Sequence, residues 1–140
     1  MKRGLSLLIL LVFSCGPKPM EKEKEFTLFE VLKTNEYSGS EVRFYEIITE
    51  SDEFKMILND PELKDKVKAK DILTSNFILL HMGEKNTGGY RLDVEEVIET
   101  EDQIIMKVKE VVPTGMVTTA ITYPLTVVRI NSKKPIVFQE

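Results

Sequence analysis

A glycine-rich octapeptide, Gly83–Tyr90, separates two stretches that have the patterns of β-strands. The stretch before it, Phe77–Met82, is apolar apart from one histidine, which is typical of a central strand covered on both faces. The stretch after it alternates apolar and polar residues, which is typical of a strand with one wet face. Since three of the chain's seven glycines lie in the octapeptide, we expect a tight turn whose main chain lies close to another surface. That surface is either the rest of the protein or a binding partner.

Short apolar and alternating runs recur through the rest of the chain, separated by clusters of turn-forming residues. The strongest pair joins residues 90–97 to residues 104–109, and its alternation slips near Glu95-Glu96, which predicts a β-bulge. The first two runs are expected to form a hairpin. Strands are expected at residues 26–32, 42–48, 77–82, 90–97, 104–109, 117–121, 125–130 and 136–138. We therefore predict a mainly β domain, an antiparallel β-sandwich or partly open barrel of seven or eight short strands.

One or two short helices are expected within residues 51–68. Ser51 is a favourable N-cap for the first, whose apolar residues recur at helical spacing as far as Leu58. Asp60 and Pro61 are favourable at the start of a second helix, because aspartate caps free amides and proline suits the first helical position. These helices are expected to cover one end of the sheet.

The N-terminus has the pattern of a secretory signal. Lys2 and Arg3 precede the apolar run Leu5–Phe13, which is shorter than the roughly 20 residues of a membrane-spanning helix. The run ends in Val-Phe-Ser-Cys, which resembles a bacterial lipobox, and Cys15 is the only cysteine in the chain. We therefore expect cleavage before Cys15 and lipidation of its sulfur. Ordinary cleavage that leaves a free cysteine, or an uncleaved anchor, are the alternatives.

This interpretation divides the chain into three parts. Residues 1–14 are the signal peptide, residues 15–25 a polar lipidated tether, and residues 26–140 a single β domain. A lipid anchor at Cys15 would hold the domain in the bacterial cell envelope, on an extracytoplasmic membrane face that is either periplasmic or on the cell surface.

The octapeptide, Gly-Glu-Lys-Asn-Thr-Gly-Gly-Tyr, resembles the signature Gly-x-x-x-Thr-Gly-Gly-Tyr of the C-terminal domain of PrcB, a family of protease-complex subunits. The resemblance extends to the turn Pro113-Thr114-Gly115 and the element Thr122-Tyr123-Pro124, and covers about residues 26–138. It implies that the partner is a secreted or surface protease, for instance a subtilisin-like one. The implied role is to assemble, anchor or stabilise the protease complex.

A looser similarity connects Asn86–Tyr90 with the first binding loop of chagasin-type inhibitors of cysteine proteases, whose pattern is Asn-Pro-Thr-Thr-Gly-Tyr. This chain lacks that proline and the second threonine, and it contains no tryptophan for the Arg-Pro-Trp loop of those inhibitors. A chagasin-like inhibitor is therefore the alternative function, and a structural envelope lipoprotein is a third.

The sequence offers little for chemistry. No Gly-Lys-Ser/Thr follows the glycine loop, so it is not a P-loop, and no set of nucleophile, base and oxyanion donor is evident. His81 is the only histidine and Cys15 is expected to be acylated, so we expect no metal and no cofactor. A net charge of −4 gives little attraction for phosphates, so we expect no nucleic-acid partner. The prediction is a non-catalytic binding protein.

The partner-binding surface is expected at the loops that share one end of the sheet. There the glycines bring main chain close, short polar groups can form hydrogen bonds, and Tyr90 is either an aromatic anchor or a cap on the core. The candidate binding residues are Lys85, Asn86, Thr87, Gly88, Gly89, Tyr90, Pro113, Thr114, Gly115, Met116, Thr122, Tyr123 and Pro124.

Overall fold

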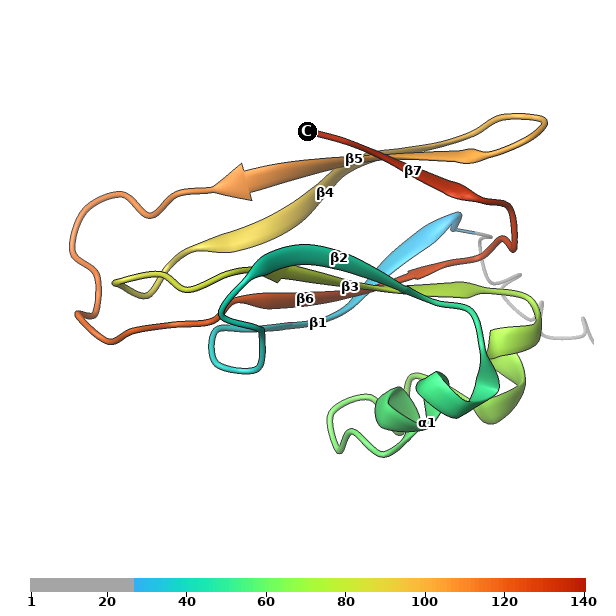
Figure 1. Ribbon diagram of the computed structural model, residues 1–140, viewed down its shortest axis with the longest axis horizontal. Helices are drawn as coiled ribbons and strands as arrows, with labels where there is room; N and C mark the ends of the chain where they lie inside the picture. Colours follow the sequence, from blue (N-terminus) through green and yellow to red (C-terminus); the bar gives the residue numbers. More distant parts are fainter. Residues whose placement is uncertain (1–26) are drawn as a thin grey trace, which may run out of the picture.

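The computed structural model describes residues 27–140, which are arranged in three layers (Figure 1). A four-stranded sheet in the order β1-β6-β3-β2 lies between a three-stranded sheet, β4-β5-β7, and a small helical layer. The predicted mainly β sandwich is therefore confirmed. The elements are β1 (Phe29–Asn35), β2 (Arg43–Ile48), α1 (Ser51–Leu58), η1 (Ala69–Leu73), β3 (Asn76–Met82), β4 (Arg91–Glu99), β5 (Ile104–Val111), β6 (Leu125–Ile130) and β7 (Ile136–Gln139).

The predicted signal peptide, the lipidation site Cys15 and the tether lie outside the described residues. Within residues 27–140, no helix has the length and apolar character needed to cross a membrane.

β3 is an inner strand of the four-stranded sheet, and all seven of its residues are buried. Successive side chains on a strand point to opposite faces of the sheet. Phe77 and Leu79 pack in the core beneath the helical layer, whereas Ile78 and Leu80 pack in the core between the two sheets. Because β3 contributes to two cores, its sequence is almost continuously apolar rather than alternating.

The predicted pairing of β4 with β5 is also confirmed. The register shifts between Val94, which lies opposite Val108, and Glu96, which lies opposite Lys107. Glu95 is therefore the extra residue of a β-bulge, at the place where the alternation slips. β5 pairs on its other side with β7 in parallel, a contact that the sequence did not predict.

The expected hairpin between the first two strands is wrong. β1 pairs with β6, and β2 pairs with β3, both antiparallel. Because β3 and β4 belong to different sheets, the glycine loop that connects them crosses from one sheet of the sandwich to the other. Its glycines therefore serve a connection between sheets rather than a hairpin turn.

The helical layer is smaller than expected. α1 forms as predicted and buries Phe54 and Ile57, but its N-cap residue is Glu50 and no side chain caps its amides, so the predicted Ser51 cap is wrong. Residues 61–66 form turns instead of a second helix, followed by the short 3-10 helix η1. Asp60 accepts a hydrogen bond from the Glu62 amide at 2.9 Å, which favours a tight turn at this point.

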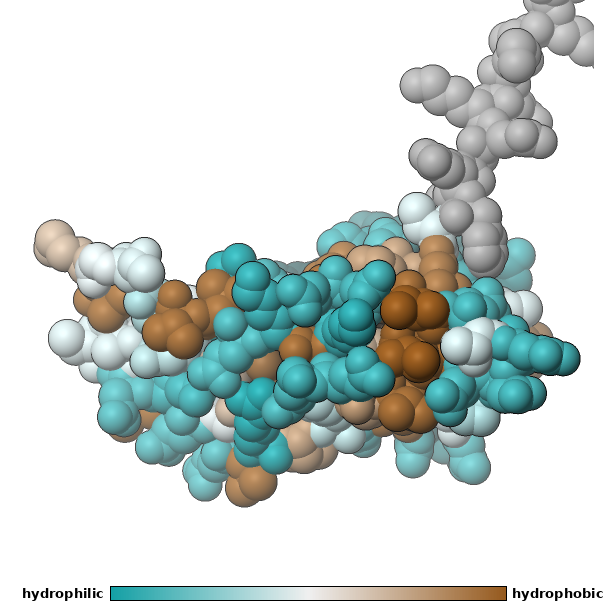
Figure 2. Space-filling model, turned by 90° about the horizontal axis from the view of Figure 1, so that it is seen from above, coloured by the Kyte–Doolittle hydropathy of each residue, from teal (hydrophilic) through white to brown (hydrophobic). Residues whose placement is uncertain are grey.

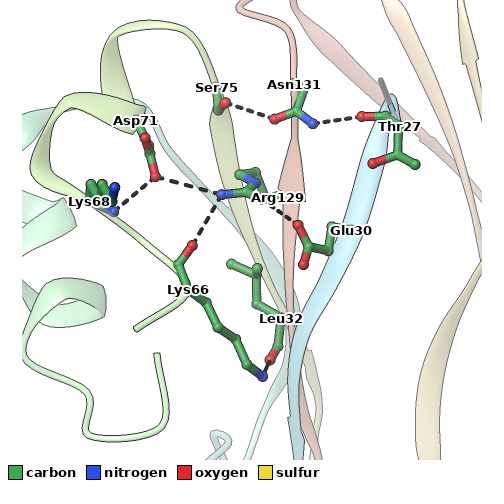
Figure 3. Close-up of polar contacts among 9 residues, drawn as sticks. All are labelled: Thr27, Glu30, Leu32, Lys66, Lys68, Asp71, Ser75, Arg129 and Asn131. Atoms are coloured by element: carbon green, nitrogen blue, oxygen red, sulfur yellow. Dashed lines mark hydrogen bonds and ion pairs between the residues drawn. The ribbon is translucent and has the colours of Figure 1, made fainter. Parts of the chain in front are cut away.

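A polar network fastens the helical layer and the start of the described chain to β6 (Figure 3). Arg129 on β6 pairs with Glu30 on β1, lies 3.6 Å from Asp71, and donates to the Lys66 carbonyl at 3.3 Å. Asn131 donates to the Thr27 carbonyl at 2.6 Å. These contacts lie at the end of the sandwich opposite the glycine loop, so the described chain begins far from that loop (Figure 1).

Candidate functional site

Three loops meet at one end of the sandwich, on the left in Figure 1. They are the glycine loop (residues 83–90), the β5–β6 loop (residues 112–124) and the β1–β2 loop (residues 36–42). The first two contain all the candidate binding residues of the sequence. The sheets therefore bring the predicted residues together, and they add a third loop that sequence reasoning missed.

The glycine loop is hydrogen-bonded directly to the β5–β6 loop. Lys85 and Thr122 exchange two main-chain hydrogen bonds, each 2.9 Å long, and the Gly88 amide donates to the Thr118 carbonyl at 3.1 Å. The Thr122 hydroxyl donates to the Thr87 carbonyl at 2.8 Å. Main-chain groups thus fix the distance between the two loops, and the buried side chain of Thr122 adds a hydrogen bond that holds them together.

At two positions of the glycine loop, the structure shows why only glycine fits. Gly89 has a φ of 88°, in the left-handed region that favours glycine, and a side chain there would reach within 2.7 Å of Cβ of Pro113. A side chain at Gly88 would collide with the Thr118 hydroxyl. The close main-chain approach predicted from the sequence is therefore real, but the neighbouring surface is the protein's own β5–β6 loop.

The β1–β2 loop braces both of the others through Glu36. The Glu36 carboxylate accepts a hydrogen bond from the Gly89 amide at 2.6 Å, and the Glu36 carbonyl accepts one from the Tyr123 amide at 2.7 Å. The Gly39 amide donates to the Tyr123 carbonyl at 2.8 Å. A side chain at Gly39 would lie 2.6 Å from that carbonyl oxygen, so Gly39 was the sequence signal that could have identified this contact.

Tyr90 is half-buried and packs against the core between the sheets, as a cap on that core. The Lys85 ammonium lies 5.3 Å from the centroid of the Tyr90 ring, within the range of a cation–π contact, and 3.9 Å from Glu110. Both side chains are therefore already engaged by the protein.

Tyr123 is a second candidate tyrosine at this end. Partial desolvation and the neighbouring Glu84 carboxylate raise the pKa of the Tyr123 phenol, so it stays protonated at neutral pH. The phenol donates to Glu84 at 3.3 Å, which links the glycine loop to the start of β6.

Exposure divides the candidate residues into two groups. Gly88, Thr122 and Pro124 are buried, and Lys85, Thr87, Tyr90, Pro113 and Tyr123 are half-buried. Asn86, Gly89, Thr114, Gly115 and Met116 are exposed. The second group, together with its exposed apolar neighbours, forms the surface that a partner can reach.

Those neighbours lie on the β5–β6 loop and were not predicted as a contact surface. Val112 is 56% exposed, Ile121 is 54% exposed, and Met116 is fully exposed. Figure 2 shows apolar side chains gathered over this loop at the left end of the molecule. The predicted strand Val117–Ile121 is wrong, because this segment is irregular and its apolar residues face solvent instead of pairing in a sheet. We refer to residues 112–121 as the apolar loop.

Within residues 27–140, no group of three or more His, Cys, Asp or Glu side chains is arranged to hold a metal ion. At this end the apolar loop presents exposed apolar side chains, and the β5–β6 loop that contains it is hydrogen-bonded to the glycine loop and the β1–β2 loop, which are also bonded to each other.

Comparison with known families places part of the chain in a known family model. A family model described as PrcB C-terminal matches residues 77–131, from β3 through the glycine loop and the apolar loop to the residue after β6. No curated protein and no solved structure matches the chain, and the looser similarity to chagasin-type inhibitors is not confirmed. The resemblance to the PrcB family is therefore confirmed for residues 77–131, the segment that contains the glycine loop and the apolar loop.

Proposed function

We propose that this chain is a secreted, lipid-anchored binding protein without catalytic activity, which associates with an extracytoplasmic protease complex and helps to assemble or stabilise it. The match to the PrcB C-terminal model supports association with a protease complex. The observation that supports the proposed site is the apolar loop, because exposed apolar side chains that cluster on one loop are typical of an interaction surface.

The apolar loop has the properties of an interface anchor. The main-chain hydrogen bonds of Thr118, and of Thr122 directly after the loop, hold its C-terminal half against the glycine loop, so binding requires little further ordering of the main chain. Met116 projects from its tip and is long, unbranched and adaptable. A partner with an apolar hollow would bury this side chain, while Asn86 and Thr114 at the rim supply hydrogen-bonding groups.

Recovery of the partner tests this function. An affinity-tagged full-length chain, incubated with envelope extract from its own cells, is expected to recover a protease that keeps its proteolytic activity. Stoichiometric loss of that activity on adding the chain would favour the inhibitor, the alternative function. Repeated recovery of envelope components without any protease would favour the structural lipoprotein and would overturn the proposal.

The lipid anchor is a separate prediction. Cells supplied with a labelled fatty-acid analogue are expected to label the wild-type chain and not Cys15→Ser, because the variant lacks the sulfur that would be acylated. Each buried methylene of an acyl chain contributes about 0.8 kcal/mol to membrane binding, so acyl chains on Cys15 would anchor the protein without a spanning helix. Cys15→Ser should also move from the membrane fraction to the soluble fraction. Equal labelling of both chains would contradict lipidation at Cys15.

An anchor on this side suits the proposed site. The described chain begins at Thr27, at the end of the sandwich opposite the three loops (Figure 1). A membrane attachment N-terminal to Thr27 would therefore leave the apolar loop directed away from the point of attachment, where a second protein can reach it.

A further inference from the structure

His81, the only histidine of the chain, is buried beneath the β1–β2 loop. It lies on β3, is 8% exposed, and stacks on Phe44 of β2 with 4.4 Å between the ring centroids. Its Nδ1 atom accepts a hydrogen bond from the Ser40 amide at 3.1 Å. A ring nitrogen that accepts from an amide carries no proton, so the imidazole is neutral in this structure and its proton is on Nε2.

The other ring nitrogen of His81, Nε2, lies near a carboxylate. Nε2 is buried and has no hydrogen-bond partner among residues 27–140, but it lies 3.9 Å from the Glu46 carboxylate of β2. On β6, the residue paired with His81 is the apolar Leu125. The β1–β2 loop presents the Ser40 main chain. Among the described residues, Glu46 is thus the charged group that bears on His81.

Protonation is incompatible with the contact to Ser40. A second proton must occupy Nδ1, where it would face the Ser40 N–H, so two donors would point at each other and the hydrogen bond would be lost. The charged ring would gain attraction to Glu46 on its opposite side. His81 therefore has two arrangements with different partners, one neutral and one charged.

The β1–β2 loop transmits this change to the binding end. Ser40 follows Gly39, whose amide is bonded to Tyr123, and the same loop carries Glu36, which holds the Gly89 amide at 2.6 Å. Release of Ser40 therefore loosens the brace of both the glycine loop and the β5–β6 loop. The connection from His81 to both loops consists of the chain from Glu36 to Ser40 and of hydrogen bonds at each end of it.

We propose that His81 is an acid-sensitive latch for the three-loop site: the neutral ring holds the β1–β2 loop in the braced arrangement, and the charged ring releases it. The proposal rests on the proposed function only in taking this end as the binding site. The latch itself is a property of the free protein and is measured without a partner.

The direction of the pH dependence follows from burial. Desolvation lowers the pKa of His81 from its ordinary value of 6.5, and Glu46 opposes this with a smaller effect. The folded state binds the proton less readily than the unfolded state. The neutral His81 therefore contributes its full share to the stability of the braced arrangement above about pH 6.5, and this contribution decreases as the pH falls below that value.

Nuclear magnetic resonance of the full chain between pH 8.0 and 5.0 tests the latch, because the single imidazole gives an unambiguous signal. We expect the Ser40, Gly39 and Gly89 amide signals to shift with the same midpoint as the His81 ring, below 6.5. In His81→Asn, whose amide oxygen takes the place of Nδ1 as an acceptor, these shifts should disappear. Amides that stay constant while the ring titrates, a ring midpoint at or above 6.5, or unchanged amide shifts in His81→Asn would each overturn the proposal.

Glu46→Gln provides a second variant that keeps the ring. It removes the carboxylate that favours the charged form, so the midpoints of the ring and of the three amides should move together to lower pH. A ring midpoint that moves without the amides would overturn the latch.

With the recovered protease in hand, wild type should bind about fivefold more weakly at pH 5.5 than at pH 7.5, the value of one lost hydrogen bond, and His81→Asn should not show this difference. Failure to recover any protease would count against the proposed function and leave the resonance result to decide the latch.

Discussion

Gly89→Ala is expected to destabilise the domain by about 2–4 kcal/mol, the sum of the cost of a left-handed alanine and of overpacking a closed site. Gly89 has a φ of 88°, and an added Cβ would lie 2.7 Å from Cβ of Pro113. Either the glycine loop or the β5–β6 loop must then shift, which breaks the hydrogen bond from Gly89 to Glu36. Urea denaturation of wild type and variant gives the difference in the free energy of unfolding.

Gly115→Ala is the matched control. Gly115 has nearly the same φ, 83°, but no described heavy atom lies within 4 Å of an added Cβ. It therefore carries only the cost of a left-handed alanine, about 1 kcal/mol, and the difference between the two variants isolates the contact with Pro113. Equal destabilisation by both substitutions would mean that the close packing of the glycine loop against Pro113 contributes nothing to stability.

The sequence correctly predicted the strands whose apolar and polar pattern reflects which of their faces are buried. β3 is nearly continuous in apolar residues because it contributes to two cores, and the slip at Glu95-Glu96 marked a bulge because only an extra residue returns Val97 to the inner face. These patterns depend on which face each residue meets, and that information is present along a single strand.

Partners far apart in the chain could not be predicted in the same way. The first two strands looked like a hairpin, but β1 pairs with β6 and β2 with β3, because pairing is decided by which edges the cores bring together. Nothing local to β7 indicated its parallel pairing with β5. Sequence adjacency was therefore a poor guide to the order of strands in the sheets.

The candidate site was predicted only in part, because it too depends on contacts between segments that are far apart in the chain. The glycine loop stood out, since closely spaced glycines mark a close main-chain approach, but the sequence did not say which surface lies opposite. The structure places the β5–β6 loop there, held by Thr118 and Thr122, and brings Glu36 from a distant loop to the Gly89 amide. The exposed apolar loop was mistaken in part for a strand, because Val117–Ile121 has strand-like composition and only its solvent exposure distinguishes it.

Met116→Asp is expected to weaken binding to the recovered protease by about 30-fold or more, the range of an interface hot spot, with a change in unfolding free energy within about 0.5 kcal/mol. Met116 is fully exposed, so the folded chain loses no packing when it is replaced. In the complex, an aspartate at the tip of the apolar loop would bury a charge without a partner. Titration of the immobilised protease with each variant gives the dissociation constants.

Met56→Asp is the matched control for this substitution. Met56 is 55% exposed on α1, in the helical layer on the far side of the four-stranded sheet from the three-stranded sheet (Figure 1). The same change of side chain there alters the net charge equally but leaves the apolar loop untouched, so binding should match that of the wild type. If Met116→Asp also binds like the wild type, the apolar loop is not the anchor. If both variants lose binding equally, net charge rather than the loop governs association, because long-range repulsion would act on both substitutions alike.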